Sequence, residues 1–501
     1  MNQLELVDEL RAIVGAAHVD AGSDVRAEDT HDESLTGEPV TPAAVVRPST
    51  TDEVSRLLAL ADSALVPVVA RGTGTGLSGG ARPVAGGIVV CFDRMDRILE
   101  IDEQNHVAVV QPGVTLRALD DALRPFGLVY PVYPGEMGSS IGGNVATNAG
   151  GMRAVRYGVT RHHVLGLELV LAGGQVIRTG GKFVKSSSGY DLTQLVLGSE
   201  GTLALVTEVT VKLAPRLVHD ATLLAPFAAM ELIGSAVAPI LSGGVTPLVL
   251  EYLDALAMGG IVREAGLELG VPDEVRKAAA AYLVVVLESS RAERLEQDTG
   301  ATADLLGRLG ALEVYVLPPT AGADLIAARE RAFFAAKAMG VDDIVDTVVP
   351  RAEIPAFLEE TARLAAEHQA IVSGCGHVGD GNVHLSVFQP DAARRHELLE
   401  AIFRAARDHG GAVSGEHGIG TEKQSYWLEL EHPVKVGLMR RIKAAFDPNG
   451  ILGPGRLLDA PVPGASTPGS RRRPEGREAE LEQEKEEDLE EEQEEQEEEE
   501  G

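Results

Sequence analysis

A glycine-rich segment lies between two short hydrophobic runs near the N-terminus. Residues 71–87 read RGTGTGLSGGARPVAGG, and the strand-like sequences LVPVVA and IVVCF flank them. Because glycine lacks a Cβ atom, the backbone amides of such a loop can approach a pyrophosphate closely. Gly74, Gly76 and Gly79 satisfy the GxGxxG pattern of Rossmann dinucleotide sites, but in those sites the pattern opens a helix. Here Pro83 and two more glycines lead directly into another strand, so we expect a dinucleotide site on a different fold.

Two further glycine clusters follow in the same β-rich region. Residues 135–158 read GEMGSSIGGNVATNAGGMRAVRYG, and residues 197–208 read LGSEGTLALVTE. The small Ser, Asn and Thr side chains of the first cluster can line the edge of a flat heteroaromatic ring. A single loop of this kind is usually a turn. Three of them in one region favour a large bound cofactor.

The hydrophobic pattern changes along the chain. Residues 1–37 read as a helix and a loop, and residues 38–216 alternate short β-branched runs with glycine turns. That second region includes two helical patterns, TDEVSRLLALADSA and LRALDDALRPFG, and Thr51 is the predicted N-cap of the first. Residues 217–459 mix longer helical segments with strands. With 56 glycines and only 4% aromatic residues in 501, an α+β enzyme is favoured over a repeat or fibrous protein.

Acidic residues dominate the chain, above all at its C-terminus. The formal net charge is −32, and residues 471–501 contain 17 acidic and 5 basic side chains. Like charges at neighbouring positions repel, so we predict that residues 460–501 form a disordered acidic tail. Nucleic acid is excluded as a partner, because phosphates are bound by clusters of Lys and Arg. A site for an acid must supply its own local positive charge.

Cysteine usage and the N-terminal sequence bear on compartment. Cys91 and Cys375 are far apart in sequence, which excludes a disulfide framework, a zinc ribbon and a bound iron–sulfur cluster. The opening MNQLELVDELRAIVGAAHV is acidic and lacks the basic start and apolar core of a signal peptide. No apolar run approaches the roughly 18 residues of a membrane-spanning helix. We expect a cytoplasmic protein, not integral to a membrane, with peripheral attachment at the inner face left open.

Residues 373–423 hold the densest set of chemically active side chains. Within SGCGHVGDGNVHLSVF and SGEHGIGTEK, His377, His384 and Glu416 are candidate metal ligands. Two imidazoles and one carboxylate suit zinc, manganese or ferrous iron, and they leave a coordination position open for substrate. The adjacent His417 is a natural proton acceptor. This set predicts an active site, and by itself it would also suit a metal-dependent hydrolase, in which the glycine clusters would have no role.

Taken together, these motifs resemble the vanillyl-alcohol-oxidase-type FAD proteins, whose flavin domain is of the PCMH type. The similarity is strongest to D-lactate dehydrogenase, the flavin subunit of glycolate oxidase and D-2-hydroxyglutarate dehydrogenase. The matching segments span residues 38–458 and are RGTGTGLSGGARP, SSIGGNVATNAGGMRAVRYG, KSSSGYDLTQLVLGSEGTLALVTEVTVKL, GHVGDGNVH, SGEHGIG and FDPNGILGPGR. The resemblance implies an α+β fold with a two-part FAD-binding domain in residues 38–216. It also implies an α+β cap domain in residues 217–459 that holds the metal site and a C-terminal FAD-contacting segment.

The resemblance also assigns roles to individual residues. FAD would be bound without a covalent link, because residues 71–76 contain neither His nor Cys. A divalent metal, zinc or manganese, would be held by the three candidate ligands, with His417 as the base and Arg329 on the substrate carboxylate. The implied FAD contacts are Arg71, Gly72, Thr73, Gly74, Thr75, Gly76, Leu77, Ser139, Ser140, Gly142, Gly143, Asn144, Asn148, Gly201 and Val206.

The implied reaction is oxidation of a small D-2-hydroxy acid, D-lactate or glycolate, to the 2-oxo acid. D-2-hydroxyglutarate dehydrogenase and a flavin subunit of a multi-subunit glycolate oxidase are the alternatives, as is a non-catalytic subunit, against which the intact cap motifs argue. The hydroxyglutarate branch has a Lys after the arginine, where this chain has Asp342, Asp343 and Asp346, and only Lys337 lies nearby. Electrons would pass to a quinone, an electron-transfer flavoprotein or a partner iron–sulfur subunit. A homodimer is also left open.

Overall fold

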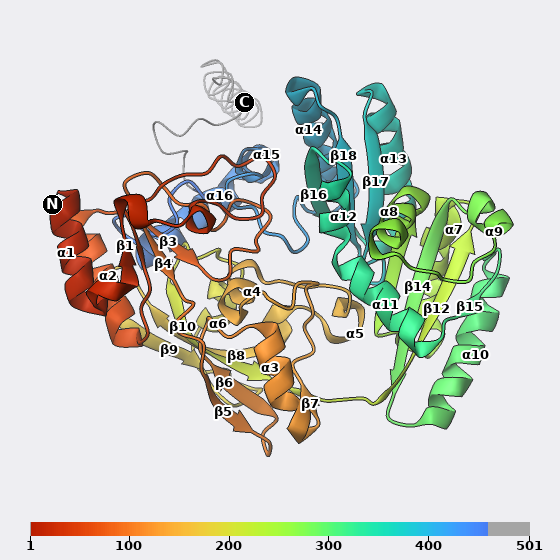
Figure 1. Cartoon of the computed structure of the whole chain (residues 1–501), viewed down its shortest axis with the longest axis horizontal. Helices are drawn as coiled ribbons and strands as arrows, with labels where there is room; N and C mark the ends of the chain where they lie inside the picture. The colour runs from red at the N-terminus through yellow and green to blue at the C-terminus, as the bar shows by residue number, and fades with distance from the viewer. Residues whose placement is uncertain (1, 459–501) are drawn as a thin grey trace, which may run out of the picture. The chain divides into compact units, whose positions relative to one another are not determined.

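The first sheet forms around the glycine-rich loop. In the computed structural model, which describes residues 2–458, this sheet has the strand order β1-β2-β4-β3 (Figure 1). Its strands are Val19–Asp20 (β1), Ala44–Val46 (β2), Ile88–Cys91 (β4) and Val68–Arg71 (β3). β3 and β4 are parallel, and residues 72–87 connect them without a helix. The Rossmann alternative is therefore excluded. The acidic segment 460–501 falls outside the described residues.

Two helices pack on this sheet through their apolar faces. α1 (Gln3–Val14) and α2 (Thr51–Ala64) bury Leu10, Leu57 and Leu58 in one core with the strands. The predicted cap of α2 was wrong by one residue. Thr50 is the N-cap, because its extended backbone lets its side chain accept a hydrogen bond from the Glu53 amide, three residues ahead.

The second sheet is antiparallel and has the order β5-β6-β10-β8-β9. Its strands are Ile98–Asp102 (β5), Val107–Val110 (β6), Leu205–Lys212 (β10), Val164–Val170 (β8) and Val176–Gly180 (β9). The helices of this part are α3 (Leu116–Leu123), α4 (Ile141–Thr147), α5 (Ala154–Tyr157) and α6 (Leu192–Val196). A short pair, β7 (Leu128–Val129) and β11 (Ala214–Pro215), closes the region. These two sheets form the two parts of the predicted FAD-binding fold.

A seven-stranded antiparallel sheet dominates the second half of the chain. Its order is β15-β12-β14-β13-β17-β18-β16. The strands are Tyr315–Val316 (β15), His219–Phe227 (β12), Ala281–Ser289 (β14), Val249–Asp254 (β13), Ile371–Gly376 (β17), Asn382–Phe388 (β18) and Asp343–Val348 (β16). We keep the predicted domain boundary after residue 216 as a proposal; it lies between β11 and β12.

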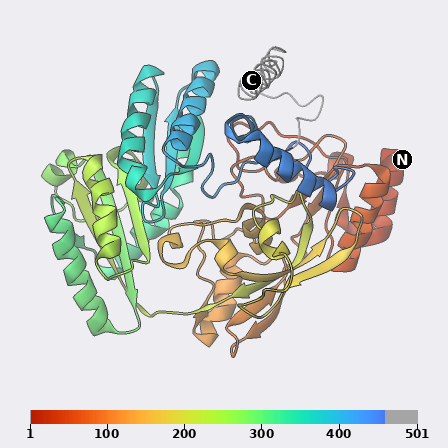
Figure 2. The same ribbon diagram turned by 180° about the vertical axis from the view of Figure 1, so that it is seen from behind.

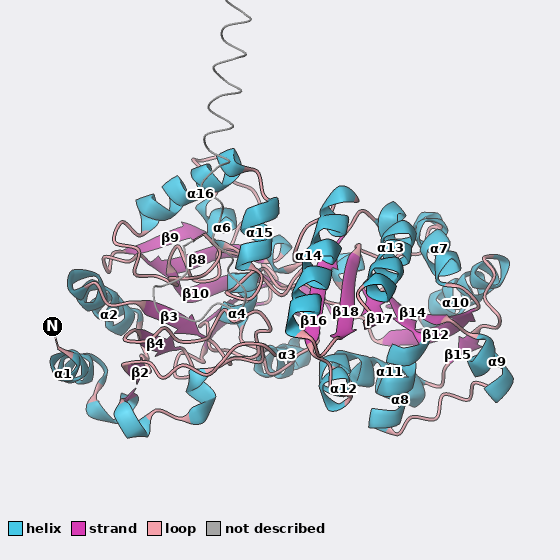
Figure 3. Cartoon of the chain, turned by 90° about the horizontal axis from the view of Figure 1, so that it is seen from above, coloured by secondary structure: helices cyan, strands magenta, loops and turns pink. Residues whose placement is uncertain are grey.

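Helices cover both faces of this sheet (Figure 3). One face packs against α7 (Met230–Ser242), α10 (Ala292–Arg308), α13 (Ile354–Glu367) and α14 (Ala392–Asp408). The other packs against α8 (Ala255–Ala265), α11 (Pro319–Glu330) and α12 (Ala332–Ala338), and α9 (Asp273–Ala278) precedes β14. In β14, Leu283 and Val285 enter the first core, whereas Tyr282 and Val284 enter the second. Burial on both faces explains why residues 281–287 of that strand are continuously apolar rather than alternating.

The C-terminal part of the described chain returns to the first sheet. After α15 (Gln424–Leu430) and α16 (Pro433–Phe446), the amide of Val68 donates to the Ile451 carbonyl at 2.7 Å. The buried Lys443 ammonium donates to the carbonyls of Thr202 and Leu452 at 2.7 and 2.8 Å. Figure 2 shows these helices, in blue, on the side of the N-terminal sheets. No helix within residues 2–458 is both long and apolar enough to cross a bilayer.

Candidate active site

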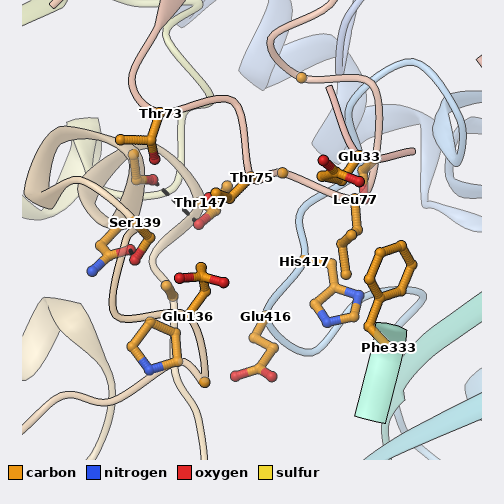
Figure 4. Close-up of a pocket in the computed structure, with 18 of the residues that line it drawn as sticks. Glu33, Thr73, Thr75, Leu77, Glu136, Ser139, Thr147, Phe333, Glu416 and His417 are labelled. Carbon is orange, nitrogen blue, oxygen red and sulfur yellow. Dashed lines mark hydrogen bonds between the residues drawn. The ribbon is translucent and has the colours of Figure 1, made fainter. Parts of the chain in front are cut away.

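One cavity of about 370 Å³ brings the two halves of the predicted site together. Glycine-rich loops of the first half line it, and so do Arg329, His377, His384, Glu416 and His417 of the second half. In Figure 4, Thr73, Thr75 and Ser139 lie toward one end, while Leu77, Phe333 and the His417 ring gather at the other. The predicted cofactor and substrate residues therefore share a single space.

The glycine loops form a cradle that side chains would fill. A Cβ atom at Gly72 would lie 2.2 Å from Ser140 Oγ, and one at Gly142 would lie 2.6 Å from the Pro112 ring. Ser140 caps α4 by accepting a hydrogen bond from the Gly143 amide at 3.2 Å. Asn144 Nδ2 is buried beside the cavity without a hydrogen-bond partner among the described residues. A narrow cradle of glycine backbone with an unpaired donor fits FAD.

All but one of the predicted FAD-contacting residues line this cavity. Asn148 is not among the lining residues; it ends α4 with φ 54°, and its side chain accepts a hydrogen bond from the Arg161 amide at 2.9 Å. The Arg71 guanidinium points away, toward the backbone carbonyls of His31 and Glu28. The predicted residues that do line the cavity are Arg71, Gly72, Thr73, Gly74, Thr75, Gly76, Leu77, Ser139, Ser140, Gly142, Gly143, Asn144, Gly201 and Val206.

The three predicted metal ligands converge on one point. His377 Nε2 lies 3.2 Å from His384 Nε2 and 3.3 Å from Glu416 Oε1, and the last two atoms are 3.3 Å apart. Atoms that bind one ion at about 2.0–2.2 Å lie roughly 3.0–3.5 Å from each other. Register explains the convergence of the two histidines: His384 lies on β18, opposite Cys375 of β17, and His377 follows β17 immediately. Three acceptor atoms on an equilateral triangle fit a divalent metal.

A buried carboxylate lies behind each of the two histidines, and the one behind His377 is hydrogen-bonded to it. Glu251 on β13 accepts a hydrogen bond from His377 Nδ1, so Nε2 is the ring nitrogen that faces the other candidate ligands. Asp346 on β16 lies opposite His384, with Oδ1 3.6 Å from His384 Nδ1. A carboxylate hydrogen-bonded behind a metal-ligating histidine fixes the ring tautomer, as Glu251 does for His377. His384 Nδ1 has no hydrogen-bond partner among the described residues. Burial opposes the charged form of His377, but the Glu251 and Glu416 carboxylates outweigh it and raise the pKa of His377 well above the usual value.

His417 lies beside the triangle without belonging to it. Its ring stacks on that of His384, with centroids 5.0 Å apart and planes inclined by 13°. Burial lowers the pKa of His417 to about 4, although the Asp346 carboxylate opposes the shift. A neutral imidazole at working pH can accept a proton. A second group of side chains, Asp346, His384 and His417, is also close enough to bind an ion.

Arg329 is buried at the end of α11, 8% exposed. Its Nη2 lies 2.9 Å from Glu251 Oε2, so Glu251 contacts both the predicted substrate arginine and a predicted metal ligand. Arg329 Nε has no hydrogen-bond partner among the described residues. An unpaired buried donor in a cavity is available to an incoming carboxylate.

The sequence-based search missed Glu251 and Asp346. Both are fully buried, at 0% exposure, and both lie in largely apolar strand segments, LVLEYLD and DIVDTVV. An isolated acid in a buried strand is the signal that could have identified them, because burying a lone charge is costly. In the sequence, Asp346 was noted only as one of three acidic residues in the segment that follows Arg329. Instead, its Oδ2 accepts hydrogen bonds from the amides of Gly415, Glu416 and His417 at 2.9–3.0 Å.

Family models match most of the chain. A model described as FAD binding domain matches residues 42–180, and one described as FAD linked oxidases, C-terminal domain, matches residues 217–457. The chain belongs to the FAD-linked oxidase family. The expected family resemblance and the expected fold are both confirmed. The protein is therefore an oxidoreductase.

Curated relatives of this FAD-linked oxidase cover nearly its whole described length. An uncharacterized FAD-linked oxidoreductase of Mycobacterium tuberculosis is 54% identical over 90% of this chain and 98% of its own. The glycolate oxidase subunit GlcD of Bacillus subtilis and the D-lactate dehydrogenase of Archaeoglobus fulgidus are each 39% identical over 83% of this chain, covering 89% and 91% of their own.

The fold of this FAD-linked oxidase also matches a solved structure. The crystal structure of p-cresol methylhydroxylase with substrate bound gives a TM-score of 0.77 at 20% identity, over 91% of this chain and 96% of the other.

Proposed function

We propose that this protein oxidises a small D-2-hydroxy acid, D-lactate or glycolate, to the 2-oxo acid, with non-covalently bound FAD and a divalent metal, zinc or manganese. The observation behind the proposal is the single cavity in which glycine loops face the His377, His384 and Glu416 triangle with His417 beside it. The names of two relatives, a D-lactate dehydrogenase and a glycolate oxidase subunit, support the substrate class.

Each residue has a defined task in this proposal. When bound, FAD would accept two electrons together with the substrate α-hydrogen, and a divalent metal would polarise the substrate hydroxyl. An imidazole nitrogen of His417 accepts the hydroxyl proton, and Arg329 binds the carboxylate. Leu77 and Phe333 lie next to the His417 ring and exclude water from that end of the cavity (Figure 4).

The electrons must leave the protein through an external acceptor. The two cysteines, Cys91 and Cys375, are free and far apart in sequence, so the chain has no ligand set for an iron–sulfur cluster. A quinone, an electron-transfer flavoprotein or a partner iron–sulfur subunit fits this requirement, and one relative is itself named as an oxidase subunit. A purified holoenzyme that is yellow and reduces a dye acceptor with D-lactate or glycolate would support the proposal. A colourless protein, or one inactive with every D-2-hydroxy acid, would refute it.

Substrate size follows from the charges around the cavity. Of the described residues that line it, only Arg71 and Arg329 carry a permanent positive charge, and the Arg71 guanidinium binds backbone carbonyls elsewhere. Lys337 pairs with Glu33 at 3.1 Å, its side chain is half exposed, and it is not among the lining residues. Burying a second substrate carboxylate without a cation would cost several kcal/mol.

We therefore expect kcat/KM for D-lactate or glycolate to exceed that for D-2-hydroxyglutarate by about tenfold or more, at least about 1.4 kcal/mol in transition-state binding. Steady-state rates with the three acids and one dye acceptor provide the measurement. Faster turnover of hydroxyglutarate would reverse the assignment and favour the dicarboxylate branch.

A pH effect on substrate binding follows from Glu330, which lines the same cavity. Burial raises the pKa of Glu330 to about 7, although the Tyr133 hydroxyl and the Arg153 charge oppose the shift. The carboxyl group is therefore neutral below that pH and repels an anionic substrate above it. We expect KM for D-lactate to rise about fivefold across this titration, since such a repulsion is worth roughly 1 kcal/mol. Glu330→Gln should remove the rise, whereas Glu264→Gln, on an exposed part of α8, should retain it. An unchanged pH profile in Glu330→Gln would disprove this role.

A further inference from the structure

One loop of the cap region contains both Glu416 and His417, and two carboxylates from different parts of the chain bind its backbone. The loop comprises residues 414–421. Asp346, on β16 of the seven-stranded sheet, accepts hydrogen bonds from the amides of residues 415–417. Glu200, from the third glycine cluster, accepts hydrogen bonds from the Ile419 and Gly420 amides at 2.8 and 2.6 Å.

The pyrophosphate loop forms a second connection to the same segment. The Ser78 carbonyl accepts a hydrogen bond from the Thr421 amide at 2.9 Å, and Ser78 Oγ donates to the Gly418 carbonyl at 3.1 Å. A Cβ atom at Gly420, whose φ is +54°, would lie 1.9 Å from the Ser78 carbonyl oxygen. The loop is therefore fitted closely against residues that follow directly on the predicted FAD contacts.

Glu200 itself is connected to the flavin side of the cavity. Its amide donates to the Ala146 carbonyl of α4 at 2.8 Å, and its neighbour Gly201 lines the cavity. Glu200 has φ 54°, a left-handed conformation that is strained for a non-glycine residue. A glycine would adopt this backbone more readily, so the Glu200 carboxylate makes its contacts from a strained backbone position.

We propose that Glu200 is a positioning residue that couples FAD binding to the metal site. FAD held by α4 and the glycine loops fixes Glu200 and Ser78. These residues fix residues 418–421, and Asp346 fixes residues 415–417 of the same loop, so Glu416 is held at the ligand triangle and His417 beside it. This inference rests on the proposed FAD and metal sites.

Coupling of this kind is reciprocal, because the factor by which FAD changes metal affinity equals the factor by which metal changes FAD affinity. The effect of metal on FAD affinity is the easier of the two to measure, and the measurement starts from the holoenzyme. The FAD dissociation constant is measured by flavin fluorescence on dilution, once with Mn²⁺ or Zn²⁺ present and once after EDTA treatment. In the wild type we expect EDTA to weaken FAD binding by about tenfold, within the usual range of coupling between sites.

Glu200→Gln should abolish this dependence, because the Ile419 and Gly420 amides bind different carboxylate oxygens, and one of those oxygens is replaced by an NH2 donor in glutamine. Glu208→Gln, which removes the same charge from β10, should behave as the wild type. Equal EDTA effects in the wild type and Glu200→Gln, or no effect in the wild type, would overturn the inference.

A second variant and a second readout protect the test against misfolding. Glu200→Gly removes the carboxylate while relieving the backbone strain, and it should uncouple FAD and metal in the same way. Hydrogen exchange of residues 414–421 should be faster in both variants than in the wild-type holoenzyme; unchanged protection would count against Glu200. Neither measurement uses a substrate. A wrong substrate class would therefore leave these results unchanged. If the wild type oxidises a D-2-hydroxy acid but its FAD affinity does not depend on the metal, only this inference is refuted.

Discussion

Replacement of His417 by Ala is expected to lower kcat by about 10²–10⁴-fold, the usual contribution of a positioned general base. The expectation rests on a buried, neutral imidazole stacked against His384 at a centroid distance of 5.0 Å. KM should change little, because the substrate carboxylate is assigned to Arg329. Stopped-flow reduction of the flavin by D-lactate isolates the affected step from later electron transfer.

The same variant decides between two roles for His417. Asp346, His384 and His417 are mutually close enough to hold an ion, so His417 could in principle be a ligand. If it is a base, His417→Ala retains its full metal content by elemental analysis. If the variant loses its metal together with its activity, His417 is a metal ligand instead. His219→Ala, which removes an exposed imidazole at the start of β12, is the control and should leave both quantities unchanged.

Residue type and local pattern predicted a non-Rossmann cofactor site and three candidate metal ligands, whereas the FAD-binding fold was expected from the family resemblance. The glycine loop between two strands indicated a non-Rossmann site, and the structure has β3 and β4 parallel with no helix between them. Two of the candidate ligands were identifiable because His377 and His384 flank a short turn between adjacent strands. Because the two histidines are close in sequence, they must also lie close together in space.

Contacts that depend on tertiary structure were not predictable. Glu251 binds His377 from 126 positions away, and Glu200 binds the Gly420 amide from 220 positions away. Helix α4 forms within a glycine-rich segment of low helix propensity, because Ser140 caps it and Ile141 and Val145 pack in the core. Packing outweighs local preference there. The residues that orient the site are thus those for which local sequence contains least information.

Loss of a metal ligand should have an effect comparable with that of losing His417. His377→Ala, His384→Ala and Glu416→Ala each remove one corner of a triangle whose sides are 3.2–3.3 Å. Polarisation of the substrate hydroxyl is worth several kcal/mol, so we expect turnover to fall by about 10³-fold or more together with metal content. FAD should remain bound at protein concentrations above its weakened dissociation constant, because the glycine cradle is built from other residues.

His409 offers a demanding control for this experiment. Its ring nitrogens lie 3.0 Å from a Glu353 oxygen and 3.1 Å from a Glu360 oxygen, so it too is a histidine between two carboxylates. No third ligand atom of a metal group is found there among the described residues. His409→Ala should keep both metal and turnover. If chelation leaves D-lactate and glycolate oxidation unchanged in the wild type, the triangle has no role in the chemistry, and the assignment of its three residues must be abandoned.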